Sequence, residues 1–222
     1  MPRLDLKIRT GIELLLLAAF TVAFLLLFPR RNTFVDISLA FLALLLIALN
    51  AGYTRTAIWS RFPSEVPERE RLKRCLGIVL PVTALLLLAC LGVGLYIGYR
   101  KAGWQGAVTR VDNWHIVPAL AFYFPWALLQ QTLFQFYLLG RLLTIFPAWL
   151  AVGLTGIFYA LVHLPDLGIT AATIAAGIFW TCMYYRYRRL VPLAFSHACL
   201  GAAFHYWIYG LDLAKEWQLI VK

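Results

Sequence analysis

Residues 75–99, CLGIVLPVTALLLLACLGVGLYIGY, contain no charged side chain. An α-helix needs about 20 mostly apolar residues to cross the hydrocarbon core of a bilayer, so this stretch is long enough to span a membrane. The whole chain has the same character, since 62% of its 222 residues are hydrophobic and 14% are charged. A soluble domain carries roughly 25% charged residues. The chain is therefore predicted to be an integral membrane protein.

Six further apolar runs have about the length of a spanning helix. We therefore predict an all-α, polytopic transmembrane helical bundle of about seven spans, forming a single transmembrane domain over residues 1–222. A Leu-Pro-Asp-Leu-Gly turn alone separates the fifth run from the sixth, so one of these two is expected to be partly re-entrant. The predicted spans are Ile12–Phe28, Val35–Tyr53, Cys75–Tyr99, His115–Leu139, Ala148–Leu164, Ile169–Tyr185 and Val191–Tyr209.

Three polar stretches separate or follow these runs. The longest is Thr54–Arg74, and its end, Glu65–Arg74, is predicted to be a short surface helix. The stretch Arg100–Asn113 carries Trp104 and is followed by Trp114, a pattern typical of a segment anchored at the membrane interface. Leu211–Lys222 has the pattern of a short amphipathic tail.

The net charge of +10 indicates contact with lipid. The lysines and arginines lie between apolar runs, where they face anionic headgroups and set the orientation of the chain. An N-terminus in the cytoplasm places most of the 20 Lys and Arg residues in cytoplasmic loops, as the positive-inside rule requires. The lipid bilayer is therefore the expected partner, in a membrane that we take to be the bacterial cytoplasmic membrane. No basic and aromatic stripe lies outside the apolar runs, so no nucleic-acid binding is expected.

Neither the cysteines nor the histidines have the spacing of a metal site. The four cysteines, which also lack disulfide-framework spacing, are interpreted as small buried hydrophobic residues; they are Cys75, Cys90, Cys182 and Cys199. His205 follows His197 by eight residues, which is about 12 Å along a helix, too far for both to bind one ion through bonds of about 2 Å. We expect no metal and no cofactor.

Polar side chains inside the predicted spans gather on three of them. They are Gln130, Gln131 and Gln135 on the fourth span, Tyr159 and His163 on the fifth, and His197 and His205 on the seventh. Residues four apart lie on one side of a helix, so each span presents a polar face. Such faces either form hydrogen bonds that hold helices together or line a common cavity, and spacing alone leaves both interpretations open.

The three polar faces together resemble a known family. Gln130-Gln131-Thr-Leu-Phe134-Gln135 resembles the Glu-Glu-x-x-x-Arg motif of the CAAX-protease and bacteriocin-processing family (CPBP, also called Abi). Tyr159-x-x-x-His163, followed by Leu-Pro, resembles its second motif, Phe-x-x-x-His, and His197-x-x-x-Gly201 its third, His-x-x-x-Asn. The resemblance covers about Phe122–Tyr206 and implies a CAAX-protease-like core over residues 115–209.

The resemblance implies an intramembrane glutamic endopeptidase, which hydrolyses peptide bonds near the membrane, including those of prenylated CAAX proteins. In that family a glutamate, helped by histidine, is proposed to activate a water molecule. The implied catalytic positions here are Gln130, Gln131, Gln135, His163 and His197, and the implied binding positions are Phe134, Tyr159, Gly201 and His205.

The departures from the motifs weaken this expected activity. Glutamine has nearly the shape of glutamate, but its amide is not a useful base. Gln135 replaces an arginine whose charge would be costly to bury once both carboxylates are gone. These additional changes favour natural divergence over deliberate inactivation. Asp166 is the acidic residue nearest to a motif, and we interpret it as a turn residue.

Three functions follow from these observations. The first is a non-proteolytic relative that binds a membrane peptide or a lipid-modified partner. The second is a peptidase that is still active on membrane-associated or prenylated peptides, with His163 or His197 as the general base. The third is an unrelated membrane protein such as a transporter component, in which the polar faces only hold helices together.

Overall fold

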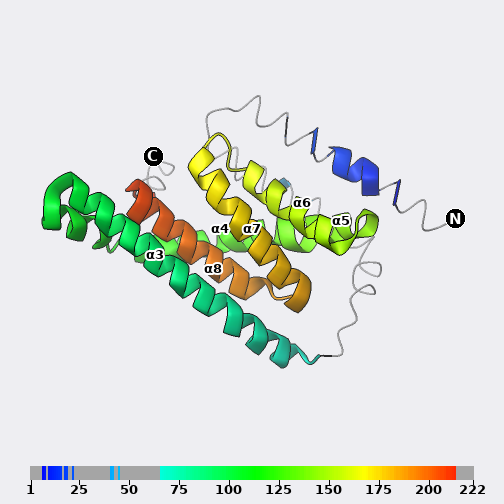
Figure 1. Cartoon of the computed structure of the whole chain (residues 1–222). Coiled ribbons are helices and arrows are strands. Elements are labelled where there is room, and N and C mark those ends of the chain that lie inside the picture. The colour runs from blue at the N-terminus through cyan, green and yellow to red at the C-terminus, as the bar shows by residue number, and fades with distance from the viewer. Residues whose placement is uncertain are drawn as a thin grey trace. The chain divides into compact units, whose positions relative to one another are not determined.

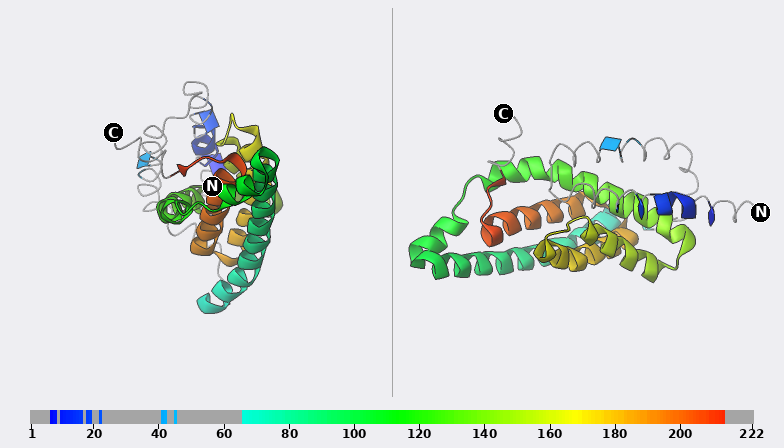
Figure 2. Two further views of the ribbon diagram at one scale, coloured as in Figure 1. Left: turned by 90° about the vertical axis from the view of Figure 1, so that its left-hand side faces the viewer. Right: turned by 90° about the horizontal axis from the view of Figure 1, so that it is seen from above.

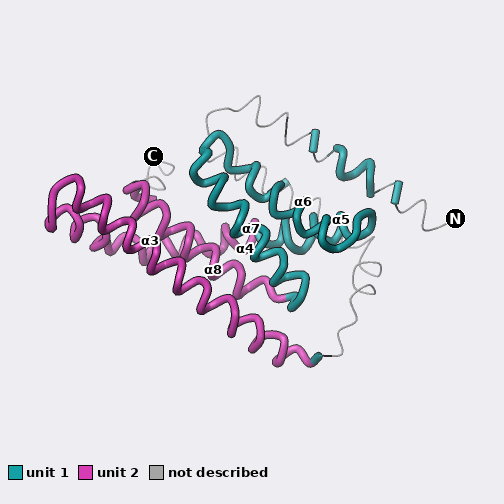
Figure 3. The backbone as a smooth tube through the Cα atoms, in the orientation of Figure 1, with its two compact units in different colours: residues 1–66, 131–188 teal, residues 67–130, 189–222 magenta. Residues whose placement is uncertain are grey.

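The computed structural model describes residues 7, 8, 10–16, 18, 19, 22, 41, 42, 45 and 66–213. Every regular element within these residues is a helix (Figure 1), which confirms the all-α fold class. The chain divides into two compact units, residues 1–66 with 131–188 and residues 67–130 with 189–222 (Figure 3). The predicted span Val35–Tyr53, much of the span Ile12–Phe28 and most of the tail Leu211–Lys222 lie outside the described residues.

The longest helix of the second unit is α3, Glu68–Val111. Its backbone is interrupted at Ala102 and Gly103, where Gly103 has φ 62° and ψ −154°, a region that essentially only glycine adopts. The chain reverses there (Figure 2), and a Cβ on Gly98 would lie only 2.4 Å from the carbonyl oxygen of Gly106. Glycine is therefore needed both for the reversal and for the close approach of the two arms.

The expected surface helix Glu65–Arg74 is not a separate element. α3 begins at Glu68 and continues into the apolar stretch without a break until Ala102. The prediction was wrong because a change from apolar to charged residues shows where a helix leaves the lipid but does not end it. A helix ends at a residue such as Gly or Pro. The predicted interfacial stretch Arg100–Asn113 contains the last part of α3, and its Trp104 side chain is exposed.

The described part of the second unit contains three further helices, and α3 packs against two of them. These two are α8, Leu190–Ala203, and the π-helix η2, Phe204–Tyr209; the third is α4, Ile116–Gln131. The hydroxyl of Thr83 on α3 donates to the Ser196 hydroxyl on α8 at 2.7 Å, and a Cβ on Gly94 would lie 2.8 Å from Trp207 Cβ. Small residues and buried hydroxyls are the usual means of helix contact in lipid.

The first unit contains the π-helix η1, Thr132–Leu138, and the helices α5, Leu139–Ile145, α6, Ala148–Leu161, and α7, Leu167–Tyr187. α6 and α7 pack along each other and are joined by a tight turn. Asp166 begins α7, because its Oδ1 accepts a hydrogen bond of 2.9 Å from the Ile169 amide. This contact confirms its predicted role as a turn residue.

Three helices of the described residues are long and apolar enough to cross a bilayer: α3, the continuous run Ile116–Ile145, and α7. They contain the third and sixth predicted spans and the fourth except for its first residue, His115. α6 is a shorter apolar helix, about 21 Å long at 1.5 Å per residue, against a hydrocarbon core of about 30 Å. The last predicted span corresponds to α8 followed by η2, so the count of seven spans is not confirmed.

Candidate functional site

The first motif lies where the geometry of the helix changes. α4 ends with Gln130 and Gln131, and the π-helix η1, which contains Phe134 and Gln135, begins at the next residue. Gln131 and Gln135 are fully buried, whereas Gln130 is half-buried. Single π-turns inside α-helices occur frequently at functional sites. The third motif is also followed by such a turn, since His205 lies in η2.

The buried amides of the first motif are poorly satisfied. Gln135 Nε2 donates to Thr181 Oγ1 at the long distance of 3.3 Å. Its Oε1, both amide atoms of Gln131 and Oε1 of Gln130 have no hydrogen-bond partner among the residues that the structure describes. Burying an amide without a partner costs about 1–3 kcal/mol by mutational measures. Such groups are rare in proteins and call for an explanation.

The second motif belongs to the same unit as Gln131 and Gln135. Tyr159 on α6 is fully buried, and its ring makes edge contacts with Phe134 at 5.1 Å and Trp180 at 5.7 Å between ring centroids. One turn later, His163 Nδ1 donates to the Tyr159 carbonyl oxygen at 2.9 Å. Within this unit the structure therefore joins the predicted residues Phe134, Tyr159 and His163 in one contact chain.

The third motif lies in the other unit, on α8 and η2. His197 is buried, and its Nε2 lies 3.5 Å from the hydroxyl of Tyr123 on α4. The Tyr123 ring also makes edge contact with His205, at 6.5 Å between ring centroids, and His205 Nδ1 donates to the Gly201 carbonyl oxygen at 2.9 Å. The predicted residues His197, Gly201 and His205 thus share one neighbour, Tyr123.

Sequence reasoning missed Tyr123. A signal was present, because residue 123 precedes Gln130 by seven positions and therefore lies on the same face of α4. A tyrosine in an apolar run is usually interpreted as packing, whereas here its hydroxyl is directed at a motif histidine.

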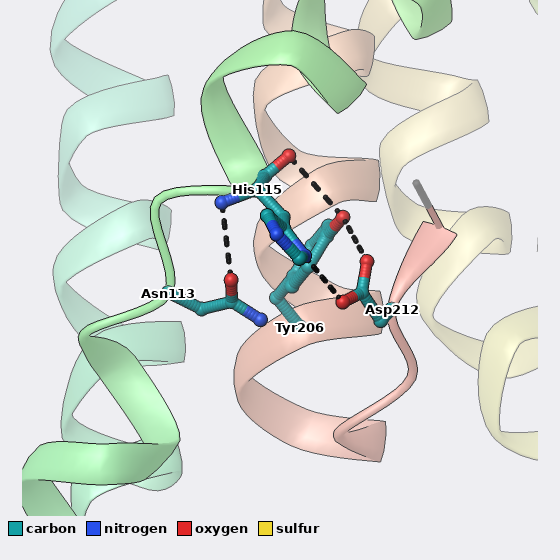
Figure 4. Close-up of polar contacts among 4 residues, drawn as sticks. All are labelled: Asn113, His115, Tyr206 and Asp212. Atoms are coloured by element: carbon teal, nitrogen blue, oxygen red, sulfur yellow. Dashed lines mark hydrogen bonds and ion pairs between the residues drawn. The ribbon is translucent and has the colours of Figure 1, made fainter. Parts of the chain in front are cut away.

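A second polar cluster in the same unit was also missed (Figure 4). His115 Nδ1 and Asp212 Oδ2 are 2.6 Å apart, and the Tyr206 hydroxyl donates to Asp212 Oδ1 at 3.0 Å and to the His115 carbonyl oxygen at 3.3 Å. Asn113 Oδ1 accepts from the His115 amide at 3.0 Å. The cluster connects the start of α4 with the segment after η2, and 97 positions separate its histidine from its aspartate, so spacing gave no hint of it.

Arg110 forms hydrogen bonds at the same end of that unit. Its Nε donates to the Trp207 carbonyl oxygen at 2.8 Å, and its Nη2 donates to the Ile208 carbonyl oxygen. Both carbonyls lie in the last turn of η2, where no further helical N–H can reach them. The cation also complements the negative end of the helix dipole.

A third buried polar group belongs to the first unit. The Arg141 side chain on α5 is 3% exposed, and its Nε donates to Glu13 Oε1 at 3.2 Å. The Tyr137 hydroxyl donates to the same oxygen. Glu13 lies near the start of the first predicted span, and its carboxylate neutralises a guanidinium that would be costly to bury alone.

The described residues contain no group of three or more His, Cys, Asp or Glu side chains placed to hold a metal ion. The side chains of the three motifs offer glutamine amides, imidazoles and a tyrosine hydroxyl.

The apolar helices and their buried polar residues define an all-α integral membrane protein in contact with the lipid bilayer. Residues 112–203, which run from just before α4 to the end of α8, match the family model described as type II CAAX prenyl endopeptidase Rce1-like. Over these residues the match confirms the resemblance to the CAAX-protease family that the motifs predicted. Comparison with curated proteins gave no match, and comparison with solved structures gave none either.

Proposed function

We propose that this protein binds a membrane peptide or a lipid-modified partner through the first-motif amide of Gln131, and that its proteolysis is weakened or lost. The burial of Gln131 carries the proposal, since this side chain is fully buried while both of its amide atoms have no partner among the described residues. A bound group that both donates and accepts hydrogen bonds would remove this cost.

A peptide backbone has the required chemistry. Each peptide unit offers one N–H donor and one C=O acceptor, which match the Oε1 acceptor and Nε2 donor of a glutamine amide. In a membrane these groups of an extended peptide lack water, so a buried amide gives them a favourable environment. The free energy of each such hydrogen bond is about 0.5–1.5 kcal/mol, enough to orient a peptide whose affinity comes from apolar contacts.

The same residues are poorly suited to hydrolysis. General-base catalysis needs a group that accepts a proton near the working pH, and neither Gln130 nor Gln131 does so. A neutral set of amides is also cheaper to bury in lipid than two carboxylates and an arginine. The replacement of three charged motif residues by glutamine is therefore coherent with a binding site.

The proposed setting is the bacterial cytoplasmic membrane with the N-terminus in the cytoplasm. The distribution of Lys and Arg along the sequence supports this orientation. The proposed partner is a peptide that reaches the site from the membrane, for which a prenyl group or an apolar segment would supply the anchor.

Binding of a fluorescent, S-farnesylated Cys-aliphatic-aliphatic-Ser peptide to the full-length protein in nanodiscs tests the proposal. Gln131→Leu keeps the approximate volume of the side chain and removes its amide, so we expect affinity to fall by about 5–10-fold, the effect of about 1 kcal/mol. Gln105→Leu, at an exposed position of α3, is the matched control and should bind as the wild type does. Equal binding by all three proteins would refute the role of Gln131.

An active peptidase is the second candidate, and one contact favours it. Because a carbonyl oxygen only accepts, the bond from His163 Nδ1 to Tyr159 places the imidazole proton on Nδ1. Nε2 of the neutral ring then keeps its lone pair and is able to accept a proton from water. If this candidate is correct, the wild type cleaves the farnesylated peptide and His163→Gln abolishes cleavage. The family match argues against the third candidate, an unrelated transporter component.

A further inference from the structure

Gly201 leaves the third motif without a side chain, and the structure places another residue in that space. A Cβ built on Gly201 would lie 2.3 Å from Cε1 and 2.8 Å from the hydroxyl oxygen of Tyr123. Carbon atoms in contact normally stay about 3.5–4.0 Å apart. The Tyr123 ring therefore occupies the volume that any larger residue at 201 would need, and the two positions form a size-matched pair.

The same ring is oriented toward both histidines of its neighbouring helix. Its centroid lies 5.6 Å from that of His197 and 6.5 Å from that of His205, both in edge-on geometry. The hydroxyl lies 3.5 Å from His197 Nε2, the long limit of a hydrogen bond. A movement of about half an ångström would bring the pair to the usual distance of about 2.7–3.0 Å.

We propose that Tyr123 is a positioning residue for His197, and that it supplies the polar contact which position 201 cannot supply. The hydroxyl donates to Nε2 and so holds the imidazole proton on Nδ1. It also fixes the plane of a buried ring. This proposal rests on the proposed function only where it assigns His197 a role in binding. Its test uses no ligand.

The glycine is essential to this arrangement. A methyl group at position 201 would push the Tyr123 ring away and separate the hydroxyl from Nε2. Conversely, if the ring is removed, the space beside position 201 becomes available, and an asparagine there could offer its amide N–H to the same nitrogen. The two positions are thus predicted to be coupled, each compensating for a change at the other.

Nitrogen-15 NMR of the imidazoles tests the proposal on the full-length protein in nanodiscs. The sequence contains four histidines, so four single His→Gln variants assign the signals. We expect His197 in the wild type to show a protonated Nδ1 and a hydrogen-bonded, unprotonated Nε2. Tyr123→Phe and Gly201→Ala should each move the His197 Nε2 signal toward that of a nitrogen without a hydrogen bond, and Tyr123→Ala combined with Gly201→Asn should move it back.

Tyr206→Phe is the matched control, because it removes a hydroxyl of the His115–Asp212 cluster. It should shift the His115 signal and leave His197 unchanged. Far-UV circular dichroism of each variant separates loss of the contact from loss of the fold. A His197 signal that Tyr123→Phe leaves in place, or a wild-type ring with its proton on Nε2, would overturn the proposal. So would a shift of all four histidines by every variant, which indicates a general structural effect.

Discussion

This chain buries both satisfied and unsatisfied polar side chains. The examples are Glu13, Gln131, Gln135 and Arg141. The charged pair is satisfied, since Arg141 donates to Glu13. The amide of Gln131 has no partner within the described residues, and that of Gln135 is satisfied on one side only. In a polar network with only a structural role, each of these buried side chains would have its hydrogen-bond partners. This contrast supports the proposal that the motif amides bind an external group.

The Glu13–Arg141 contact gives a prediction about stability. Glu13→Gln leaves a buried guanidinium without its counter-charge, so the free energy of unfolding should fall by about 3 kcal/mol. Glu70→Gln removes the exposed partner of Arg74, and the loss there should be much smaller because solvent screens an exposed ion pair. Unfolding by denaturant in micelles measures both. Equal losses in the two variants would show that Arg141 is not buried as described.

Gln135 gives a second prediction at this scale. Gln135→Arg buries a cation at a fully buried position and should destabilise the protein by about 2–3 kcal/mol. Adding Gln131→Glu, four residues earlier in the same unit, should recover at least half of this loss because the two charges then pair. Gln105→Arg, on an exposed surface, should be neutral. If the double variant instead lost as much stability as the two single variants combined, the result would argue against a coupled loss of charge at positions 131 and 135.

At the scale of elements, helix contacts depend on glycines that permit close approach. On α6, a Cβ at Gly156 would lie 2.4 Å from Ile178 Cγ1 and 2.8 Å from its backbone nitrogen, whereas Gly153, three residues earlier, has nothing within 4 Å. The turn between α6 and α7 is short, so the two helices cannot separate to relieve such a clash. Gly156 is therefore needed for the close contact between α6 and α7, whereas Gly153 has open space beside it.

This difference predicts opposite effects of one substitution. Gly156→Ala should lower the free energy of unfolding by about 1–3 kcal/mol through overpacking. Gly153→Ala should be neutral or stabilising by up to about 1 kcal/mol, because alanine has the higher helix propensity. Thermal unfolding followed by circular dichroism compares the two variants. A larger loss for Gly153→Ala than for Gly156→Ala would contradict the described packing of α6 on α7.

At the scale of the whole molecule, composition was enough to predict a helical membrane protein, and three short motifs were enough to predict the family model that residues 112–203 match. The contacts of the site were harder to foresee. Glu13 with Arg141 and His115 with Asp212 pair across more than 90 positions, and no local spacing encodes such pairs. The π-turns were also invisible, since a uniformly apolar sequence gives no periodicity from which an extra residue per turn could be inferred.

Labelling the two ends of α3 in the full-length protein tests the proposed orientation of the chain in the membrane. Arg69 and Lys101 are about 48 Å apart along this helix at 1.5 Å per residue, slightly more than the thickness of a bilayer with its headgroups. In a background without the four native cysteines, Arg69→Cys should resist a membrane-impermeant maleimide added to intact cells, and Lys101→Cys should react. The reverse pattern would place the N-terminal end of α3 outside.

Cleavage of the S-farnesylated peptide by the wild type and by the Gln130→Glu/Gln131→Glu variant tests the central claim most directly. We predict that the wild type binds the peptide without hydrolysing it above the rate without protein. Restoring both carboxylates should produce cleavage, because the variant regains a group that accepts a proton from water. Efficient hydrolysis by the wild type, lost in His163→Gln, would contradict the account and identify the protein as an active peptidase.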